Sequence, residues 1–158
     1  MEGSVDVLMG TLSKAIGSEG GFVCADNTIV EYLRNKARSF IFSTSISPVT
    51  AAVAIAGIEC ITRDRVAALR ENIRYFCDRL NESGLDVRSD TAIIPVIVGD
   101  EKKALDVSAK LKEHGYYVSA IRYPTVKKNS ARLRITLMSS HTKEELDGLA
   151  DLIGRYCL

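Results

Sequence analysis

Residues 47–80 constrain the fold of this chain more than any other stretch, because one helical pattern there changes from mainly apolar to amphipathic halfway along. Ser47 and Pro48 are typical of an N-cap and a first helical position, so a helix begins there. Residues 49–61 are almost all small and apolar, which predicts that this half is buried. Apolar residues then recur at helical spacing on a charged background: Val66, Leu69, Ile73, Phe76 and Leu80. We therefore expect one long helix that leads from a first domain, residues 1–62, into a second domain, residues 63–158.

Composition argues against several classes of function. Lysine and arginine number 21 against 20 aspartate and glutamate, giving a formal charge of +1, so nothing favours binding to nucleic acid or to an anionic membrane. The four cysteines show no CxxC spacing and only two histidines accompany them, so no metal site is predicted. No signal-peptide pattern and no apolar run of membrane-spanning length is found. We expect a cytoplasmic globular protein with reduced thiols.

The first domain is predicted to present a lysine on a glycine-rich turn between two strands. Residues 5–10 have the length and β-branched content of a buried strand, and residues 21–25 form a second, shorter one. Lys14 lies in the turn that joins them, among hydroxyl residues and glycines. A helix over residues 28–37 and an extended segment over residues 39–43 complete the pattern.

The second domain has the pattern of a small α+β unit. The elements expected after the long helix are an extended segment at 85–88, strands at 93–98, 117–121 and 131–137, a helix at 101–114 and a final helix with a Thr142 and Glu145 capping box. Residues 131–137 alternate, so Leu133 and Ile135 share one face of the strand while Arg132 and Arg134 share the other. Two arginines are therefore expected to point the same way.

Lys14 is a candidate nucleophile. An amine attacks an aldehyde only when it is unprotonated, and emergence from a buried strand would lower the pKa of a lysine by desolvation. Thr11, Ser13 and the backbone N–H groups of the glycines are suitable donors to the phosphate of pyridoxal phosphate. The alternative is a solvated turn lysine whose glycines serve backbone geometry alone. A nucleotide-binding P-loop is excluded, because no GxxxxGK[ST] pattern is present.

Three segments in order give this chain a specific resemblance. They are residues 11–17 (TLSKAIG) with Gly20 and Gly21, residues 40–48 (FIFSTSISP), and residues 121–126 (IRYPTV) followed by 131–135 (ARLRI). Together they resemble the α-oxoamine synthases, a family of class II aminotransferase-like enzymes that use pyridoxal phosphate. The resemblance implies an α/β fold: the C-terminal part of an aminotransferase-type (fold type I) large domain, followed by a small α+β C-terminal domain.

The resemblance also implies which residues hold the cofactor. Lys14 would match the lysine that binds the cofactor covalently and later removes the α-proton of the amino acid. Thr11 would match a hydroxyl that binds the cofactor phosphate. Ser43 or Thr44 would match a hydroxyl given to that phosphate by the neighbouring subunit of a homodimer; the adjacent hydroxyl residues leave this register open.

On the substrate side, Arg134 would match the arginine that binds the carboxylate of the amino acid, with Arg132 as the next candidate; the alternative is a solvated strand face. The activity implied is decarboxylative condensation of an amino acid with an acyl-CoA or acyl-carrier thioester. The segments are most similar to the biotin-pathway branch, which joins alanine to a pimeloyl thioester. The glycine C-acetyltransferase, 5-aminolevulinate synthase and serine palmitoyltransferase branches stay open.

The sequence departs from the family in one respect. Family members carry, upstream of the lysine segment, an aspartate for the pyridine nitrogen, a histidine that stacks on the ring and a glycine-rich phosphate turn, and this chain has no counterpart of them. We expect the polypeptide alone to be inactive or nearly so, whether it is a fragment, a truncated gene model or one half of a split enzyme, completed by a missing N-terminal half. The competing hypothesis is a non-catalytic dimerisation or regulatory module.

Overall fold

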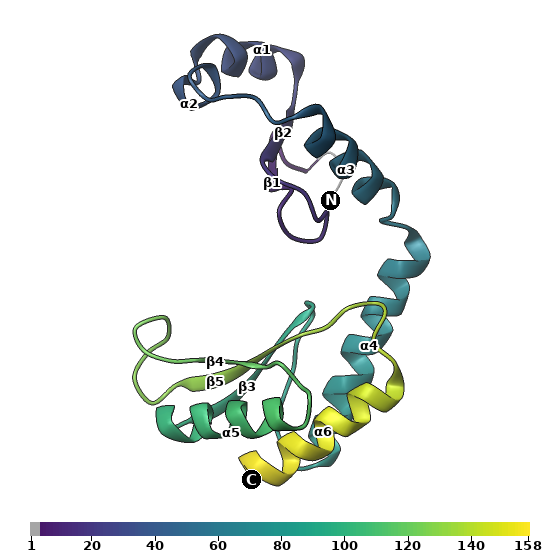
Figure 1. The fold of residues 1–158 in the computed structure, drawn as a ribbon, viewed down its shortest axis with the longest axis vertical. Coiled ribbons are helices and arrows are strands. Elements are labelled where there is room, and N and C mark those ends of the chain that lie inside the picture. The colour runs from purple at the N-terminus through teal and green to yellow at the C-terminus, as the bar shows by residue number, and fades with distance from the viewer. Residues whose placement is uncertain (1–3) are drawn as a thin grey trace. The chain divides into compact units, whose positions relative to one another are not determined.

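The structure, a computed structural model, describes residues 4–158 and divides into two compact units, Met1–Thr62 and Arg63–Leu158 (Figure 1). Each unit is described by itself. None of the helices in the described part of the chain is long and apolar enough to cross a membrane.

A β-hairpin and three helices make up the first unit. Strands β1 (Val7–Thr11) and β2 (Gly21–Ala25) pair antiparallel, with Val7 opposite Ala25 and Thr11 opposite Gly21. The helices are α1 (Asn27–Lys36), α2 (Arg38–Ile41) and α3 (Pro48–Glu59). The Asp26 carboxylate accepts a hydrogen bond from the Thr28 N–H and caps α1, and Ser47 caps α3 as predicted.

Two expectations for this unit are wrong. Residues 39–43 are not extended, because the chain turns back into a helix after a break at Ala37, and the Ile41 N–H donates to the Ala37 carbonyl at 2.9 Å. The long helix is also interrupted: α3 ends at Glu59, and α4 begins at Arg63. The break falls on Ile61 and Thr62, whose β-branched side chains lower helix propensity, so the chain tightens into short-range turn hydrogen bonds there.

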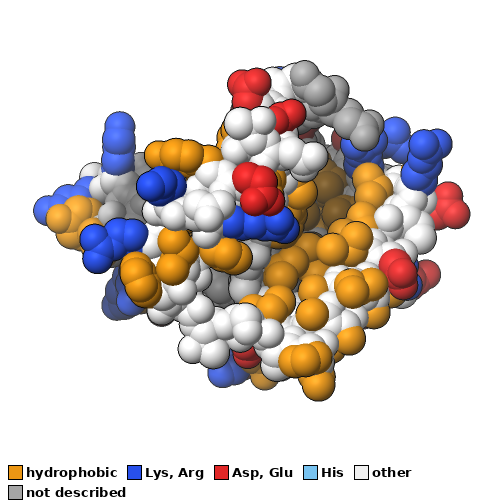
Figure 2. Space-filling model, turned by 90° about the horizontal axis from the view of Figure 1, so that it is seen from above, with side chains coloured by type: hydrophobic (Ala, Val, Ile, Leu, Met, Phe, Trp, Pro, Cys, Tyr) orange, Lys and Arg blue, Asp and Glu red, His pale blue; other side chains and the backbone are white. Residues whose placement is uncertain are grey.

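The first unit has very little core, contrary to the burial expected for residues 5–10 and 49–61. Leu12 and Ala54 are the buried hydrophobic residues among residues 4–62. Many large apolar side chains are exposed instead: Val5, Val7, Leu8, Met9, Val23, Tyr32, Phe40, Ile41, Phe42, Ile46, Val49, Val53, Ile55, Ile58 and Ile61. Figure 2 shows how widely hydrophobic side chains cover the surface in that view. The elements of this unit form locally, and their apolar surface has no partner in the described chain.

A three-stranded antiparallel sheet with helices on one face forms the second unit. Its strands are β3 (Ile93–Gly99), β4 (Ser119–Ile121) and β5 (Ala131–Thr136), in the order β3-β5-β4. Its helices are α4 (Arg63–Glu82), α5 (Glu101–Glu113) and α6 (Lys143–Cys157), and the predicted capping box starts α6. The extended segment expected at 85–88 joins neither sheet of the described structure. The Asn81 side chain instead bonds both the N–H and the carbonyl of Val87, at 2.8 and 3.1 Å.

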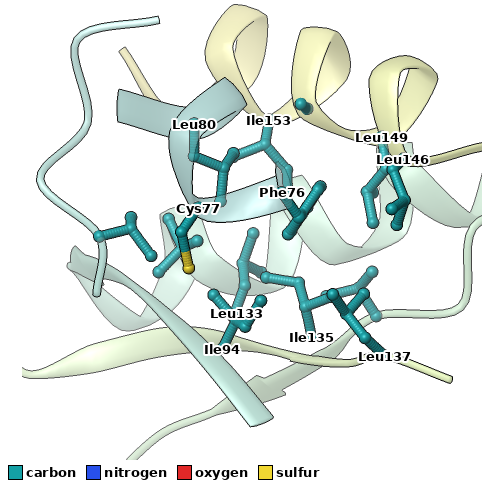
Figure 3. Close-up of a cluster of buried hydrophobic side chains, with 14 of the residues drawn as sticks. Phe76, Cys77, Leu80, Ile94, Leu133, Ile135, Leu137, Leu146, Leu149 and Ile153 are labelled. Carbon is teal, nitrogen blue, oxygen red and sulfur yellow. The ribbon is translucent and has the colours of Figure 1, made fainter. Parts of the chain in front are cut away.

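One face of the sheet packs against the helices and makes the core of this unit (Figure 3). Leu133 and Ile135 of β5 are buried, as the alternation predicted, and they meet Phe76 from α4 and Ile153 from α6. Phe76 and Leu133 have no exposed surface. The opposite face of β5 carries Arg132, Arg134 and Thr136, so the two arginines share the side of the sheet that the helices leave open.

Polar contacts fix α4 against α6. The Arg79 guanidinium and the Tyr75 hydroxyl both donate to the Asp147 carboxylate, at 2.8 and 2.7 Å. The Tyr75 hydroxyl, followed by Arg79, lowers the pKa of Asp147 from its usual value. The buried Asn72 amide donates to the carbonyls of Met138 and His141 and so holds the chain just ahead of α6.

Candidate functional site

Lys14 lies in the loop that closes the β1–β2 hairpin. The Leu12 N–H donates to the Gly20 carbonyl at 2.9 Å, and the Ser18 N–H donates back to the Leu12 carbonyl at 2.8 Å, so the loop has its own hydrogen bonds. Gly17 and Gly20 have φ values of 71° and 98°, in the left-handed region that favours glycine. The glycines therefore shape the turn that presents the lysine.

The Lys14 side chain is exposed in this chain, contrary to the desolvated position expected from a buried strand. Strand β1 is itself exposed over most of its length, so it gives the amine no apolar surroundings. Within residues 4–158, the Lys14 amine makes no hydrogen bond or ion pair. The amine is accessible to a ligand.

Thr11 and Ser13 bring two hydroxyls together directly ahead of Lys14. Their side-chain oxygens lie 2.8 Å apart, and the Ser13 N–H donates to Thr11 Oγ1 at 3.2 Å. Both residues are exposed. The Thr11 hydroxyl also donates to the Gly20 carbonyl over a long distance, 3.4 Å, and it can exchange that bond for one to an anionic group beside the amine.

The lysine loop rests on one face of α3. The Ser18 hydroxyl donates to the Thr50 carbonyl at 2.7 Å. Further along the helix, a Cβ atom at Gly57 would overlap the Ile16 carbonyl oxygen and lie 3.0 Å from Ile16 Cγ2. Ala54, one turn before Gly57, is the buried residue of this helix. A small-residue face of α3 therefore lets the backbone of the lysine loop approach closely.

This contact gives the first prediction. Gly57→Ala should improve helix propensity, yet we expect it to destabilise the packing of the lysine loop by about 1–3 kcal/mol, because the added methyl group displaces Ile16. Amide hydrogen exchange at Leu12 and Ser18 measures the effect, and both should exchange faster. Ala56→Gly, at an exposed position on the same helix, is the matched control and should leave these two amides unchanged. Slower exchange in Gly57→Ala would show that propensity dominates and that the contact is not tight.

Ser43 and Thr44 follow α2 in the same unit. The Ser43 hydroxyl donates to the Ser39 carbonyl and so terminates the helix, while Thr44 is exposed. No hydrogen bond joins either hydroxyl to the lysine loop in the part of the chain that the structure describes. The segment meets the loop through Ile46, since a Cβ atom at Gly20 would lie 3.2 Å from Ile46 Cγ2. The structure thus groups Thr11, Ser13 and Lys14 and leaves Ser43 and Thr44 apart from them.

Arg132 and Arg134 lie on the central strand of the second unit, and Arg134 is opposite Ser119 on β4. Arg134 is opposite Pro95 on β3, and Arg132 is opposite Ile97 on β3 and Ile121 on β4. The Arg132 Nε donates to the Ser130 carbonyl at 3.1 Å. Arg134 is exposed, and within residues 4–158 it has no hydrogen bond or ion pair. Its planar set of donors is available to a carboxylate.

A cavity of about 500 Å³ covers this face. Its lining adds a third arginine to Arg132 and Arg134, namely Arg88, which precedes β3 and which sequence reasoning missed. No residue of the cavity lining carries a carboxylate. The only sequence signal for Arg88 is its position shortly before β3. The pairing of β3 with the arginine-bearing strand β5 cannot be predicted from the residues around Arg88, so its place in the cavity could not be predicted either.

Similarity to known proteins identifies the family of this chain. The chain belongs to the aminotransferase class I and II family, whose model matches residues 1–153. It is 45% identical over 150 residues to the 8-amino-7-oxononanoate synthase of Symbiobacterium thermophilum, covering 93% of this chain and 38% of that enzyme. The resemblance to the α-oxoamine synthases is therefore confirmed, and the fold is that of the α/β enzymes of this family.

Two solved structures extend the likeness to the fold. The serine palmitoyltransferase of Sphingomonas wittichii superposes with a TM-score of 0.89 at 29% identity, covering 96% of this chain and 39% of its own. The 8-amino-7-oxononanoate synthase of Francisella tularensis superposes with a TM-score of 0.81 at 28% identity, covering 94% of this chain and 44% of its own. The chain thus spans about two fifths of the length of the relatives that it matches.

Pyridoxal phosphate is the cofactor of this family, and solved structures of SPT with PLP match this chain with a TM-score of 0.88. The residues of the lysine loop fit that group. The free Lys14 amine suits its aldehyde, and the Thr11 and Ser13 hydroxyls suit its phosphate.

Proposed function

We propose that this chain carries the lysine and substrate-binding parts of a pyridoxal-phosphate-dependent acyltransferase. The reaction is condensation of an amino acid, alanine, with a pimeloyl thioester of CoA or a carrier protein, with loss of carbon dioxide. The observation that carries the proposal is that a chain 45% identical to an 8-amino-7-oxononanoate synthase has an unengaged Lys14 amine in its first unit and an unengaged Arg134 guanidinium in its second. The second unit takes the place of the small C-terminal domain of that fold.

Lys14 has two tasks in this mechanism. Its Nζ would hold the aldehyde of the cofactor, and the same amine would act as the base that takes the α-proton of the amino acid. When bound, pyridoxal phosphate supplies an electron sink for the negative charge left at the α-carbon. That carbon would form a bond to the thioester carbonyl as the thiolate leaves, the former amino-acid carboxylate would depart as carbon dioxide, and Lys14 would return its proton to the α-carbon.

The hydroxyls hold the phosphate in place. Thr11 and Ser13 donate to it from the lysine loop, where their contact keeps both oxygens on the same turn. Ser43 or Thr44 donates to the phosphate of the partner subunit, which makes the active form a homodimer. Four free cysteines fit a reducing, cytoplasmic setting for this assembly.

Arg134 binds the carboxylate of the amino acid, with Arg132 beside it on the same strand face. A guanidinium can hold a carboxylate through two parallel hydrogen bonds, which fixes the orientation of the α-carbon. The carboxylate of the 8-amino-7-oxononanoate product cannot come from the amino acid, which loses its own as carbon dioxide. The product carboxylate therefore derives from the acyl donor, whose chain is dicarboxylic.

Arg134→Lys tests the role of this arginine. A lysine keeps the charge and loses the planar pair of donors, so we expect KM for the amino acid to rise about tenfold, the equivalent of one strong hydrogen bond to a charged group. Steady-state kinetics of the chimera described in the next paragraph measure the change in KM. Arg132→Lys is the control, because that side chain already donates to the Ser130 carbonyl, and its effect on KM should be smaller. Equal effects of the two changes would contradict the assignment.

The activity itself is tested by completing the chain. A chimera joins the region that precedes the matched segment in the Symbiobacterium thermophilum enzyme to this chain, and thiol release from pimeloyl-CoA is followed with alanine present. Release of thiol and carbon dioxide in equal amounts supports the proposal. Transfer of the amino group to a keto acid without thioester consumption would overturn it.

The second candidate function is a non-catalytic module that dimerises or regulates. The observation that favours it is the exposed apolar surface of the first unit, together with the solvated position of Lys14 in this polypeptide. It predicts that the chain binds a protein partner and forms no adduct with pyridoxal phosphate.

A further inference from the structure

The cavity on the open face of the sheet is richer in arginine than the proposed function requires. Arg88, Arg132 and Arg134 line it, and none of the lining residues is acidic. Recognition of one amino-acid carboxylate engages Arg134 with Arg132 as its neighbour. Arg88 has no role in that task.

Two of the three hydroxyl residues that line the cavity, Ser89 and Thr91, are engaged with the backbone. The Ser89 hydroxyl donates to the Ile93 carbonyl at 2.8 Å, and the Thr91 hydroxyl donates to the same carbonyl at 3.2 Å. Both are therefore engaged with the backbone just ahead of and within β3. The rest of the lining is Thr125 and the apolar residues Ile93, Pro95 and Ile121. An anionic ligand in this cavity is bound by its arginines, while an alkyl chain lies against the apolar residues between them.

Arg88 is free to take part. Its closest acidic neighbour is Asp86, at 3.8 Å, and both side chains are more than nine-tenths exposed, so that ion pair is weak. Arg88 also lines the adjacent cavity on the α4 side, whose lining includes Asp78 and Asp90, yet Asp86 is the acidic residue with which it forms an ion pair. The guanidinium of Arg88 can therefore leave Asp86 for a carboxylate at little cost.

We infer that Arg88 binds the distal carboxylate of the acyl donor and makes this cavity selective for dicarboxylic over monocarboxylic acyl chains. The inference rests on the proposed function, because a dicarboxylic donor is what the oxononanoate product requires. It assigns the two carboxylates of the substrates to different arginines on one sheet face. The apolar residues between them accept the methylene chain.

The test uses the chain as it exists and two simple ligands, heptanedioate and heptanoate. Each is titrated into ¹⁵N-labelled protein, and the Nε–Hε resonances of the arginines are followed. Heptanedioate should shift the Arg88 resonance together with that of Arg134, and should bind about threefold to tenfold more tightly than heptanoate. In Arg88→Gln this advantage should disappear while heptanoate affinity stays the same. Arg70→Gln is the matched control, since Arg70 lines the neighbouring cavity and does not line this one.

Several results would overturn the inference. They are equal binding of the two acids to the wild-type chain, loss of the preference in Arg70→Gln, or equal weakening of both acids in Arg88→Gln. Unchanged amide spectra of the buried core residues confirm that the exposed substitution leaves the fold intact. In the chimera, Arg88→Gln should lower kcat/KM for pimeloyl-CoA and leave that for heptanoyl-CoA unchanged. A chimera that consumes no thioester refutes the proposed function, whereas the ligand preference of the chain is decided separately by the titration.

Discussion

Lys14→Ala is expected to abolish covalent attachment of pyridoxal phosphate to this chain. The Lys14 amine is accessible, has no partner within residues 4–158 and follows the Thr11 and Ser13 hydroxyls, which can hold the phosphate beside it. Attachment through an amine gives an absorbance band in the near-visible range, and reduction with borohydride fixes the group to its lysine for mass spectrometry. The wild-type chain should show the band and a labelled peptide containing Lys14.

The control for this experiment is another exposed lysine of the same unit. Lys36, in the last turn of α1, reacts with aldehydes as any solvated amine does, but no pair of hydroxyls directly precedes it. Lys36→Ala should retain the band at full strength. A band that survives in Lys14→Ala, or labelling spread evenly over many lysines, would mean that the chain has no specific cofactor lysine.

Phe76→Ala is expected to cost the second unit about 3–5 kcal/mol in free energy of unfolding, because it leaves a cavity at the centre of a close-packed core. Phe76 has no exposed surface and packs among side chains from α4, α6 and the sheet (Figure 3). Urea unfolding monitored by circular dichroism measures the loss. Val66→Ala, near the exposed start of the same helix, should cost less than about 1 kcal/mol. A loss below that value for Phe76→Ala would indicate that the core is loosely packed.

Much of the second unit could be predicted from the sequence because its signals are local and agree with one another. The apolar spacing of α4 and the alternation of β5 predict the faces that are buried in the structure, and the capping box predicts where α6 begins. The segment expected to be extended at 85–88 joins no sheet of the described structure, and no local pattern shows why. A side chain from α4, Asn81, takes the hydrogen bonds that a neighbouring strand would have made.

Burial of the first unit could not be predicted in the same way. An apolar sequence shows which residues are stabilised by burial, but it does not show whether the chain provides another apolar surface for them to pack against. Residues 49–61 form the expected helix as far as Glu59, yet only Ala54 is buried. The break before Arg63 and the short helix α2 depend on one or two residues at an element end, where sequence patterns are least informative.

Within the candidate site, the lysine loop could be predicted from the sequence, but the residues from other elements that pack against it or share a cavity with the arginines could not. Lys14, Thr11 and Ser13 are adjacent in sequence, so a turn brings them together. Gly57 and Arg88 make contacts that are distant in sequence. Gly57 lies against a loop about forty residues earlier in the chain, and Arg88 shares a cavity with strand β5, which follows much later. A glycine inside a helix was the one available hint for Gly57, since such a residue often marks close packing.

The scarcity of core in the first unit also has a consequence during synthesis. A ribosome delivers residues 4–62 before it delivers the chain that builds the sheet of the second unit, and domains generally fold in that order. Of the two units, the one with more exposed apolar surface is therefore translated before the other. We expect the nascent chain to be a strong client for ribosome-associated chaperones, with the dependence on them set by Phe42, Val49 and their exposed neighbours.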